Sequence, residues 1–219
     1  MFQIRPETPA DIGTVNALLD AGFGPDRRQR TVYRMRQNGP VDGLCFVATD
    51  PVSDEPLATI RFYEVALGTG HRSLLLGPLA VHRDLQGLGL GRALVSHGLS
   101  VGRHMEWSYC LVSGEPDYYR PYGFVDAAPF NISMPGPVRA NWLQVLGFSS
   151  DALPALGVGP HAVGPIVPAE NADQPRRWVR PAEHGVSGAP NDDGRVARFA
   201  MVASSGPMSD RQNRPSLPI

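Results

Sequence analysis

A proline and four glycines within residues 74–92 constrain the fold of this chain more than any other feature. Residues 74–81 read LLLGPLAV, an apolar run typical of a buried β-strand. Because proline cannot donate to a sheet ladder, Pro78 inside this run predicts a bulge or a strand that parts from its neighbour. Residues 86–92 then read QGLGLGR and open a helical pattern. We therefore expect a central strand to turn into a helix here.

The junction between this strand and this helix is a candidate anion site. The first N–H groups of a helix have no partner within it, and the helix dipole makes that end positive. Together these effects favour a phosphate. A plain tight turn is the alternative explanation of the glycines. The residues that would form the phosphate cradle are Gln86, Gly87, Leu88, Gly89, Leu90, Gly91 and Arg92, the last with a guanidinium that can add a charge-assisted hydrogen bond.

A dinucleotide-binding turn is disfavoured by the spacing of these residues. The glycines follow G-x-G-x-G, and Arg92 stands where the third glycine of G-x-G-x-x-G belongs. Polar residues 82–86 separate the strand from the first glycine, whereas the dinucleotide turn follows its strand at once. The next strand-like run ends in Cys110 to Val112, without the acidic residue that a ribose would need.

Two motifs give the chain a resemblance to a known family. Gln86-x-x-Gly89-x-Gly91 is similar to the Q/R-x-x-G-x-G/A acyl-CoA pyrophosphate loop of the GNAT superfamily of N-acetyltransferases. Residues 118–124, YYRPYGF, resemble the Y-x-x-x-G-F segment of that family, and about a helix and a strand separate the two motifs, as in the family. The phrases LLLGPLAVHRDLQGLGLGRALV and GEPDYYRPYGF are especially similar to the YhbS-like branch. The resemblance covers about residues 1–168.

The resemblance implies a fold, a co-substrate and a reaction. The fold is the acyl-CoA N-acyltransferase fold, a mixed α/β sheet in three α-β-α layers with splayed central strands. The reaction moves an acetyl group from acetyl-CoA directly to a primary amine, with no acyl-enzyme and no metal. The backbone of the bulged strand at Leu79, Ala80 and Val81 would hold the pantetheine arm. An N–H near Leu79 would stabilise the oxyanion.

The resemblance also implies a proton donor. Tyr119 lies four residues before Gly123, where the family carries the tyrosine that protonates the departing thiolate. A phenol with a pKa of about 10 is protonated at neutral pH, as this role requires. Tyr118 and Tyr122 are the neighbours that can exchange roles with Tyr119. A core tyrosine without a catalytic role is the alternative.

The general base is the open part of the site. Many members of the family carry a carboxylate on the central strand, but residues 74–81 contain no acidic residue. Glu64 and Glu115 are the candidate carboxylates, and His82 is a further candidate. A structural role for each, with proton removal through ordered water, is the alternative.

A cluster of arginines precedes the second strand-like region. It lies where the first helices of the resembled family border the acceptor site, which favours an anionic acceptor. A solvated helix face is the commoner explanation of such a cluster. The cluster consists of Arg27, Arg28, Arg30, Arg34 and Arg36.

Composition narrows the partners and the compartment. A net charge of −1 gives no electrostatic case for nucleic acid or a membrane surface. All 20 basic residues are arginine, so no lysine can serve as nucleophile or phosphate ligand. Cys45 and Cys110, two cysteines in apolar runs, fit small buried residues of a reducing cytoplasm rather than a disulfide framework. The start MFQIRPETPAD has no apolar signal core, and no segment is long enough for a membrane span. We expect a cytoplasmic protein.

The remaining patterns predict the order of the elements. Thr8, Pro9 and Asp11 form the start signal of a first helix. A second, basic helix is expected over 28–37 with Val32 and Met35 buried, and a short helix over 141–146. The other expected strands are residues 2–5, 44–49, 57–64, 107–112 and 130–134, and the other expected helices are residues 12–22, 89–102 and 117–119.

The chain divides into two parts with different compositions. Residues 1–168 form the acetyltransferase-like domain, and residues 169–219 form a tail rich in proline, glycine, serine and arginine, which buries too little apolar surface to order itself. The function expected is N-acetylation of a small-molecule amine. A non-catalytic acyl-CoA-binding sensor or scaffold, and a protein N-acetyltransferase, are the alternatives. A homodimer is an open expectation.

Overall fold

The computed structural model describes residues 1–29, 31–36, 38–68, 70–136, 138–157 and 159–165. The expected tail, the end of the expected first domain and Arg30 of the arginine cluster lie outside these residues.

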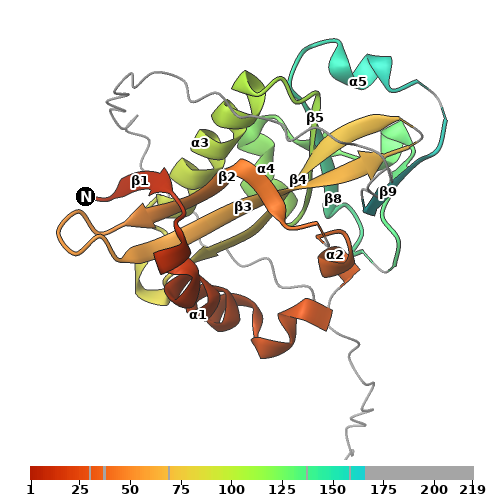
Figure 1. Ribbon diagram of the computed structural model, residues 1–219. Coiled ribbons are helices and arrows are strands. Elements are labelled where there is room, and N and C mark those ends of the chain that lie inside the picture. The colour runs from red at the N-terminus through yellow and green to blue at the C-terminus, as the bar shows by residue number, and fades with distance from the viewer. Residues whose placement is uncertain (30, 37, 69, 137, 158, 166–219) are drawn as a thin grey trace, which may run out of the picture.

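One mixed sheet organises the described part of the chain (Figure 1). Its strands follow the order β1-β2-β3-β4-β5-β8-β6, with β9 paired to β3 and to β7. The β4–β5 and β7–β9 pairs are parallel and the others are antiparallel. The strands are β1 (Gln3–Pro6), β2 (Pro40–Thr49), β3 (Pro56–Leu67), β4 (His71–Val81), β5 (Tyr109–Ser113), β6 (Val125–Asp126), β7 (Ile132–Ser133), β8 (Leu143–Gly147) and β9 (His161–Pro165).

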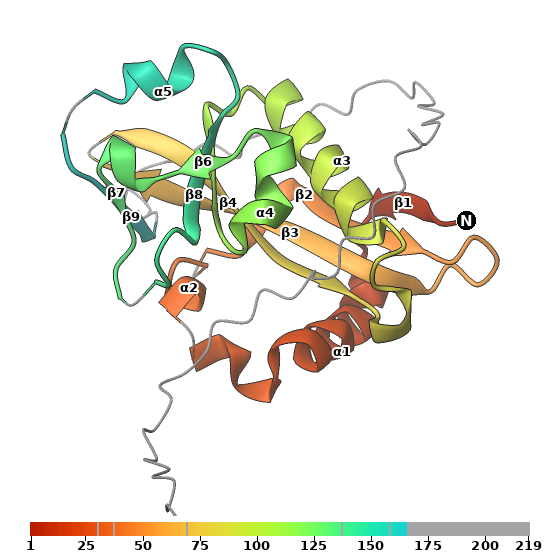
Figure 2. The same cartoon turned by 180° about the vertical axis from the view of Figure 1, so that it is seen from behind.

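Helices cover both faces of this sheet, which confirms the expected three layers (Figures 1 and 2). Helix α1 (Ile12–Phe23) packs Val15 and Leu19 against Val47 of β2 and Ala80 of β4. Helix α3 (Leu90–His104) buries its apolar stripe against the opposite face. Because side chains alternate along a strand, the same β4 segment serves both layers, with Leu79 and Val81 on the α3 side. The shorter helices are α2 (Thr31–Arg34), α4 (Pro116–Tyr119) and α5 (Ala152–Ala155).

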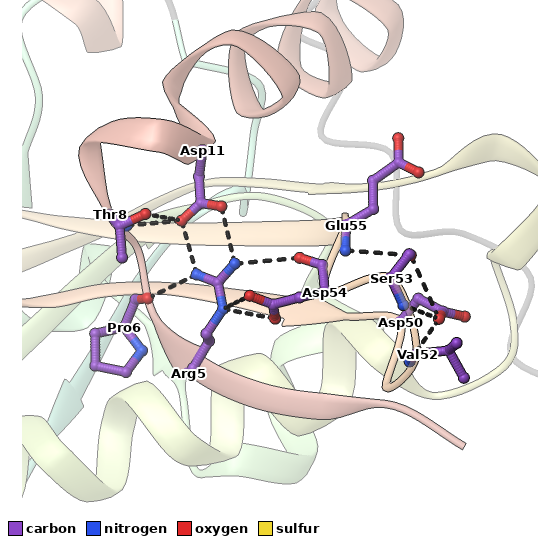
Figure 3. A network of polar contacts seen from close by, with 9 residues as sticks. All are labelled: Arg5, Pro6, Thr8, Asp11, Asp50, Val52, Ser53, Asp54 and Glu55. Carbon is purple, nitrogen blue, oxygen red and sulfur yellow. Dashed lines mark hydrogen bonds and ion pairs between the residues drawn. The ribbon is translucent and has the colours of Figure 1, made fainter.

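The start of the first helical segment confirms the capping signal read from the sequence. Thr8 and Asp11 form a capping box around a 3₁₀ turn, Pro9–Asp11, that leads into α1. The guanidinium of Arg5 donates to both oxygens of Asp11, at 2.7 and 2.9 Å, and to Asp54 at 2.8 Å (Figure 3). Arg5 therefore joins β1, the start of α1 and the β2–β3 turn. Hydrogen bonds from Arg5 lower the pKa of the buried Asp11 carboxyl well below its usual range.

The basic segment after α1 is less helical than the sequence predicted. It forms a 3₁₀ helix, Pro25–Gln29, and then the single turn of α2, whose chain continues in i→i+3 hydrogen bonds as far as Arg36. Tertiary contacts override helix propensity here, because Arg27 is buried and its Nε donates to Asp20 at 2.6 Å. Met35 is buried, as predicted.

The short helix predicted over 141–146 is wrong, because this segment forms β8. Asn141 has φ of +62°, which prevents a helix from starting there. Strand β8 then pairs with β5 over its whole length, from Leu143 opposite Ser113 to Gly147 opposite Tyr109. This pairing supplies hydrogen-bond partners for the backbone of β8, whose other edge is mostly unpaired within the described residues.

Candidate functional site

A β-bulge interrupts β4 at the proline that the sequence singled out. Leu79 pairs with Ile60 of β3, and Leu76 pairs with Phe62. Between these two pairs, β4 therefore contains one residue more than β3. The extra residue lies at Gly77–Pro78, where Gly77 has φ of +109°. The bulge predicted from Pro78 is therefore confirmed.

Strands β4 and β5 part beside this bulge. Their described pairs are Leu74 with Cys110 and Leu75 with Leu111, although β4 continues to Val81 and β5 to Ser113. The sheet thus remains continuous through β3–β4 on one side and β5–β8 on the other, while the edges between them separate.

The register shows which backbone groups of β4 face this parted edge. The His82 N–H donates to the Leu57 carbonyl at 2.8 Å, which makes this pair a hydrogen-bonded one in the antiparallel ladder. Bonded and non-bonded pairs alternate, so the N–H and C=O groups of Leu79 and Val81 point away from β3. Those of Ala80 point toward β3. Of the three predicted backbone positions, the structure brings two to the parted edge and turns the third away.

The glycine segment connects β4 to α3 through open turns. Gly87 and Gly89 have φ of +83° and +89°, and no atom lies within 4 Å of a Cβ built on either one. Only glycine adopts this conformation freely. Helix α3 begins at Leu90 with Gly89 as its N-cap, and Leu88 is exposed. Gln86 turns back, because its side-chain amide donates to the Val81 carbonyl at 3.4 Å.

Gly91 is a glycine for a different reason. It lies inside the first turn of α3, where a Cβ would stand 2.7 Å from the Tyr118 hydroxyl and 3.3 Å from a methyl of Val81. Both distances are shorter than ordinary contacts. The helix therefore approaches the end of β4 and the tyrosine segment closely at this point. Arg92, the next residue, is exposed.

The tyrosine segment after β5 supplies three protonated phenols. Tyr119 is 1% exposed and packs edge-on against Tyr118 and Phe124. Burial raises the pKa of Tyr119 well above its ordinary value, and it raises the pKa of Tyr118 and, to about 12, that of Tyr122. The Tyr118 hydroxyl is buried and has no hydrogen-bond partner within the described residues. It is the group that faces Gly91.

The candidate bases occupy different environments. Glu64 on β3 forms an ion pair with Arg72 of β4, whose guanidinium lies over the Trp107 ring at 5.3 Å. Glu115 is the N-cap residue of α4, two residues after the end of β5, and its side chain makes no capping hydrogen bond. His82 is half-exposed, and its ring accepts from the Asp84 N–H at 3.4 Å. Glu115 is thus the candidate base that lies at the start of the helix carrying Tyr118 and Tyr119.

The arginine cluster does not form a single solvated face. Arg28 and Arg34 are exposed, whereas Arg27 is buried and paired with Asp20. Arg36 reaches the bulge, where its Nη2 lies 3.3 Å from a Cβ built on Gly77. Sequence reasoning missed this position as a separate site. No sequence pattern singled it out, because the chain leaves α-helical geometry before Arg36.

The surroundings of the two cysteines disfavour their thiolate forms. Both are free, and Cys110 is fully buried. Burial raises the pKa of the Cys45 thiol to about 12 and raises that of Cys110 as well.

Among the residues that the structure describes, no group of three or more His, Cys, Asp or Glu side chains is arranged to hold a metal ion. Within the same residues, no helix has both the length and the apolar character that crossing a membrane would require.

Known proteins resemble this chain in sequence and in fold. A family model described as the acetyltransferase (GNAT) family matches residues 14–119. YhbS of Escherichia coli strain K12, named as an uncharacterized N-acetyltransferase, is 30% identical over 151 residues, which are 68% of this chain and 89% of YhbS.

Two crystal structures extend these matches to the fold. That of YhbS from Escherichia coli in complex with CoA has a TM-score of 0.65 and 30% identity, covering 75% of this chain and 89% of that one. That of a GNAT family acetyltransferase from Brucella melitensis in complex with acetyl-CoA has a TM-score of 0.55 and 26% identity, covering 75% of this chain and 95% of that one.

Proposed function

Because the chain belongs to the GNAT family of acetyltransferases, we propose that it transfers an acetyl group from acetyl-CoA to a primary amine of a small metabolite. Acetyl-CoA-dependent acyl transfer follows from the family, and the small amine is our proposal. One observation carries it: β4 and β5 separate after Leu75, and the open glycine segment before α3 lies at the end of the same strand. We propose that the reaction takes place in the cytoplasm.

The glycine segment is proposed to bind the pyrophosphate of acetyl-CoA. In support, the space beside Gly87 and Gly89 is open, as a close approach of phosphate to backbone requires. The unpaired N–H groups at the start of α3 add the positive end of a 15-residue helix. Arg92 is exposed beside them and can add a charge-assisted hydrogen bond.

The parted edge of β4 is proposed to bind the pantetheine arm. The backbone groups of Leu79 and Val81 point toward that edge, so they can pair with an amide-bearing chain as another strand would. We assign the Leu79 N–H to the oxyanion of the tetrahedral intermediate. A donor of this kind is worth about 3–4 kcal/mol in comparable sites.

The transfer itself needs one base and one acid. The amine nitrogen attacks the thioester carbon, a C–N bond forms, and the C–S bond breaks. We assign the departing proton of the amine to Glu115, with Glu64 as the competing candidate. We assign protonation of the thiolate to Tyr119, because burial keeps its phenol in the proton-bearing form. Tyr118 and Tyr122 lie next to it and carry protons too.

An acceptor screen tests the proposal. Free CoA released from acetyl-CoA is measured across a panel of small amines and short peptides, together with the mass of each product. We expect amine-dependent CoA release and a product heavier by one acetyl group. Tight binding of CoA with no amine that accelerates its release would refute the transfer reaction. Turnover on peptides alone would instead identify a protein N-acetyltransferase.

A further inference from the structure

Arg36 carries a positive charge into the protein beside the bulge of β4. Its Nε atom is buried and has no hydrogen-bond partner among the described residues. Two aromatic rings lie against its guanidinium. The Cζ atom is 4.6 Å from the ring centroid of Tyr33 and 5.2 Å from that of Tyr63. A ring attracts a cation but supplies no acceptor in the plane of the guanidinium, and the Nε–H donor is left without a partner within the described residues.

Arg27 shows what a satisfied arginine in the same region looks like. Its three nitrogens donate to Asp20 at 2.6 Å, to the Tyr33 hydroxyl at 3.1 Å and to Asn16 at 3.1 Å. Within the described residues no ion pair of this kind reaches Arg36. Burial lowers the pKa of Arg36, yet a guanidinium stays charged at any ordinary pH, so loss of a proton cannot relieve the burial.

The position of Arg36 connects this unused charge to the proposed reaction centre. A Cβ built on Gly77 would stand 3.3 Å from Arg36 Nη2 and 3.7 Å from the backbone nitrogen of Leu79. Leu79 supplies the N–H that we assign to the oxyanion. The guanidinium therefore lies at the bulge, next to the point where the thioester carbonyl would be held.

We propose that Arg36 binds a carboxylate of the acceptor, so that the amine acetylated by this enzyme belongs to a small amino-carboxylic acid. This inference rests on the proposed function. A guanidinium matches a carboxylate through two parallel hydrogen bonds. The charge of Arg27 is already balanced by Asp20, so the charge offered at the bulge by the described residues is that of Arg36. One positive charge suits a carboxylate better than a phosphate with nearly two negative charges. Tyr33 and Tyr63 hold the guanidinium in place from its sides.

The test compares matched acceptors that differ in the carboxylate alone. The kcat/KM of each of several α-amino acids is measured against that of its carboxamide. We expect the wild-type enzyme to prefer the carboxylate by about 10- to 100-fold, as a charged hydrogen-bonded pair provides. The carboxamide has the less basic amine, so ionisation of the nucleophile cannot produce this preference. Wild-type turnover that is equal or better with carboxamides would overturn the assignment.

Variants connect the preference to the residue. Arg36→Met should bring the ratio of the two kcat/KM values close to one, with acetyl-CoA affinity unchanged, and Arg36→Lys should keep part of the preference. Arg103→Met is the matched control, because Arg103 also lies over an aromatic ring, that of Phe148 at 5.8 Å, but on α3 across the sheet. An unchanged preference in Arg36→Met would refute the inference.

A measurement on the wild-type enzyme covers the case in which Arg36→Met fails to fold. Simple carboxylates such as propionate should inhibit competitively against the amine and not against acetyl-CoA, and an absence of inhibition would refute the inference. The proposed function fails in a different way, through the absence of CoA release with every amine.

Discussion

The hydroxyl of Tyr118 stands 2.7 Å from the position that a Cβ at Gly91 would occupy. A methyl group there would press on a rigid aromatic side chain. We expect Gly91→Ala to destabilise the protein by about 1–3 kcal/mol, as overpacking does. The loss should be smaller in a Tyr118→Phe background, because the clashing oxygen is gone. Denaturant unfolding of the four proteins of this cycle measures the coupling, and additive losses would show that the contact is not the cause.

Gly89 should matter for the cofactor rather than for packing. Gly89→Ala places a side chain in open space in the left-handed region, at φ of +89° and ψ of −6°. Gly24→Ala, after α1, also places a side chain in open space at positive φ, but with ψ of 158°, a region that essentially only glycine occupies. Gly89→Ala should cost about 1–2 kcal/mol of stability through backbone strain, and Gly24→Ala should cost more. Only Gly89→Ala should also weaken acetyl-CoA binding, measured by calorimetry. Equal affinities in both variants would remove the glycine segment from the cofactor site.

Tyr119→Phe should lower turnover without loss of binding. Removal of a positioned acid typically costs about 10²–10⁴-fold in rate. Because burial raises the pKa of Tyr119, the wild-type enzyme should show no loss of activity from its ionisation as pH rises toward 10. Tyr118→Phe is the control, and it should leave turnover unchanged. The stability of the fold should stay the same or increase, since that hydroxyl is buried without a described partner. A Tyr119→Phe enzyme with full kcat would assign the proton to another donor.

The two candidate bases can be separated by their effects on rate and on stability. Glu115→Gln should lower kcat/KM by about 10²–10⁴-fold, because the side chain that would accept the amine proton is gone. Glu64→Gln should leave kcat/KM unchanged and reduce stability instead, since Glu64 forms an ion pair with Arg72. The reverse pattern would assign the base to Glu64. Unchanged kcat/KM in both variants would favour proton removal through ordered water.

The Arg5–Asp11 pair should make the fold sensitive to acid. The pKa of Asp11 is lowered in the folded state, so the unfolded chain binds the proton more readily. The stabilisation is therefore present at pH 7 and is lost as pH falls below about 4. Asp11→Asn should cost about 2 kcal/mol at pH 7, and its difference from wild type should shrink in acid. Asp54→Asn, at an exposed partner of Arg5, should cost less stability than Asp11→Asn, because solvent screens an exposed ion pair.

Features set by neighbouring residues were predictable from the sequence. Pro78 in an apolar run led to the bulge, and Thr8 with Asp11 led to the capping box, because each acts within a few residues of chain. The glycines at 87 and 89 likewise fixed an open turn before α3. Segment 141–146 was misassigned because its strand depends on pairing with β5, some thirty residues earlier.

Because proline and glycine limit the backbone locally, the residue pattern was enough to predict where the central strand bulges and where the following helix presents its free N–H groups. The tertiary structure alone decided what lies next to these points. It placed Tyr118 against Gly91, gave Glu64 an ion-pair partner and brought Arg36 to the bulge at Gly77. Such contacts join segments distant in the chain, and their energies depend on burial and packing that no local pattern encodes.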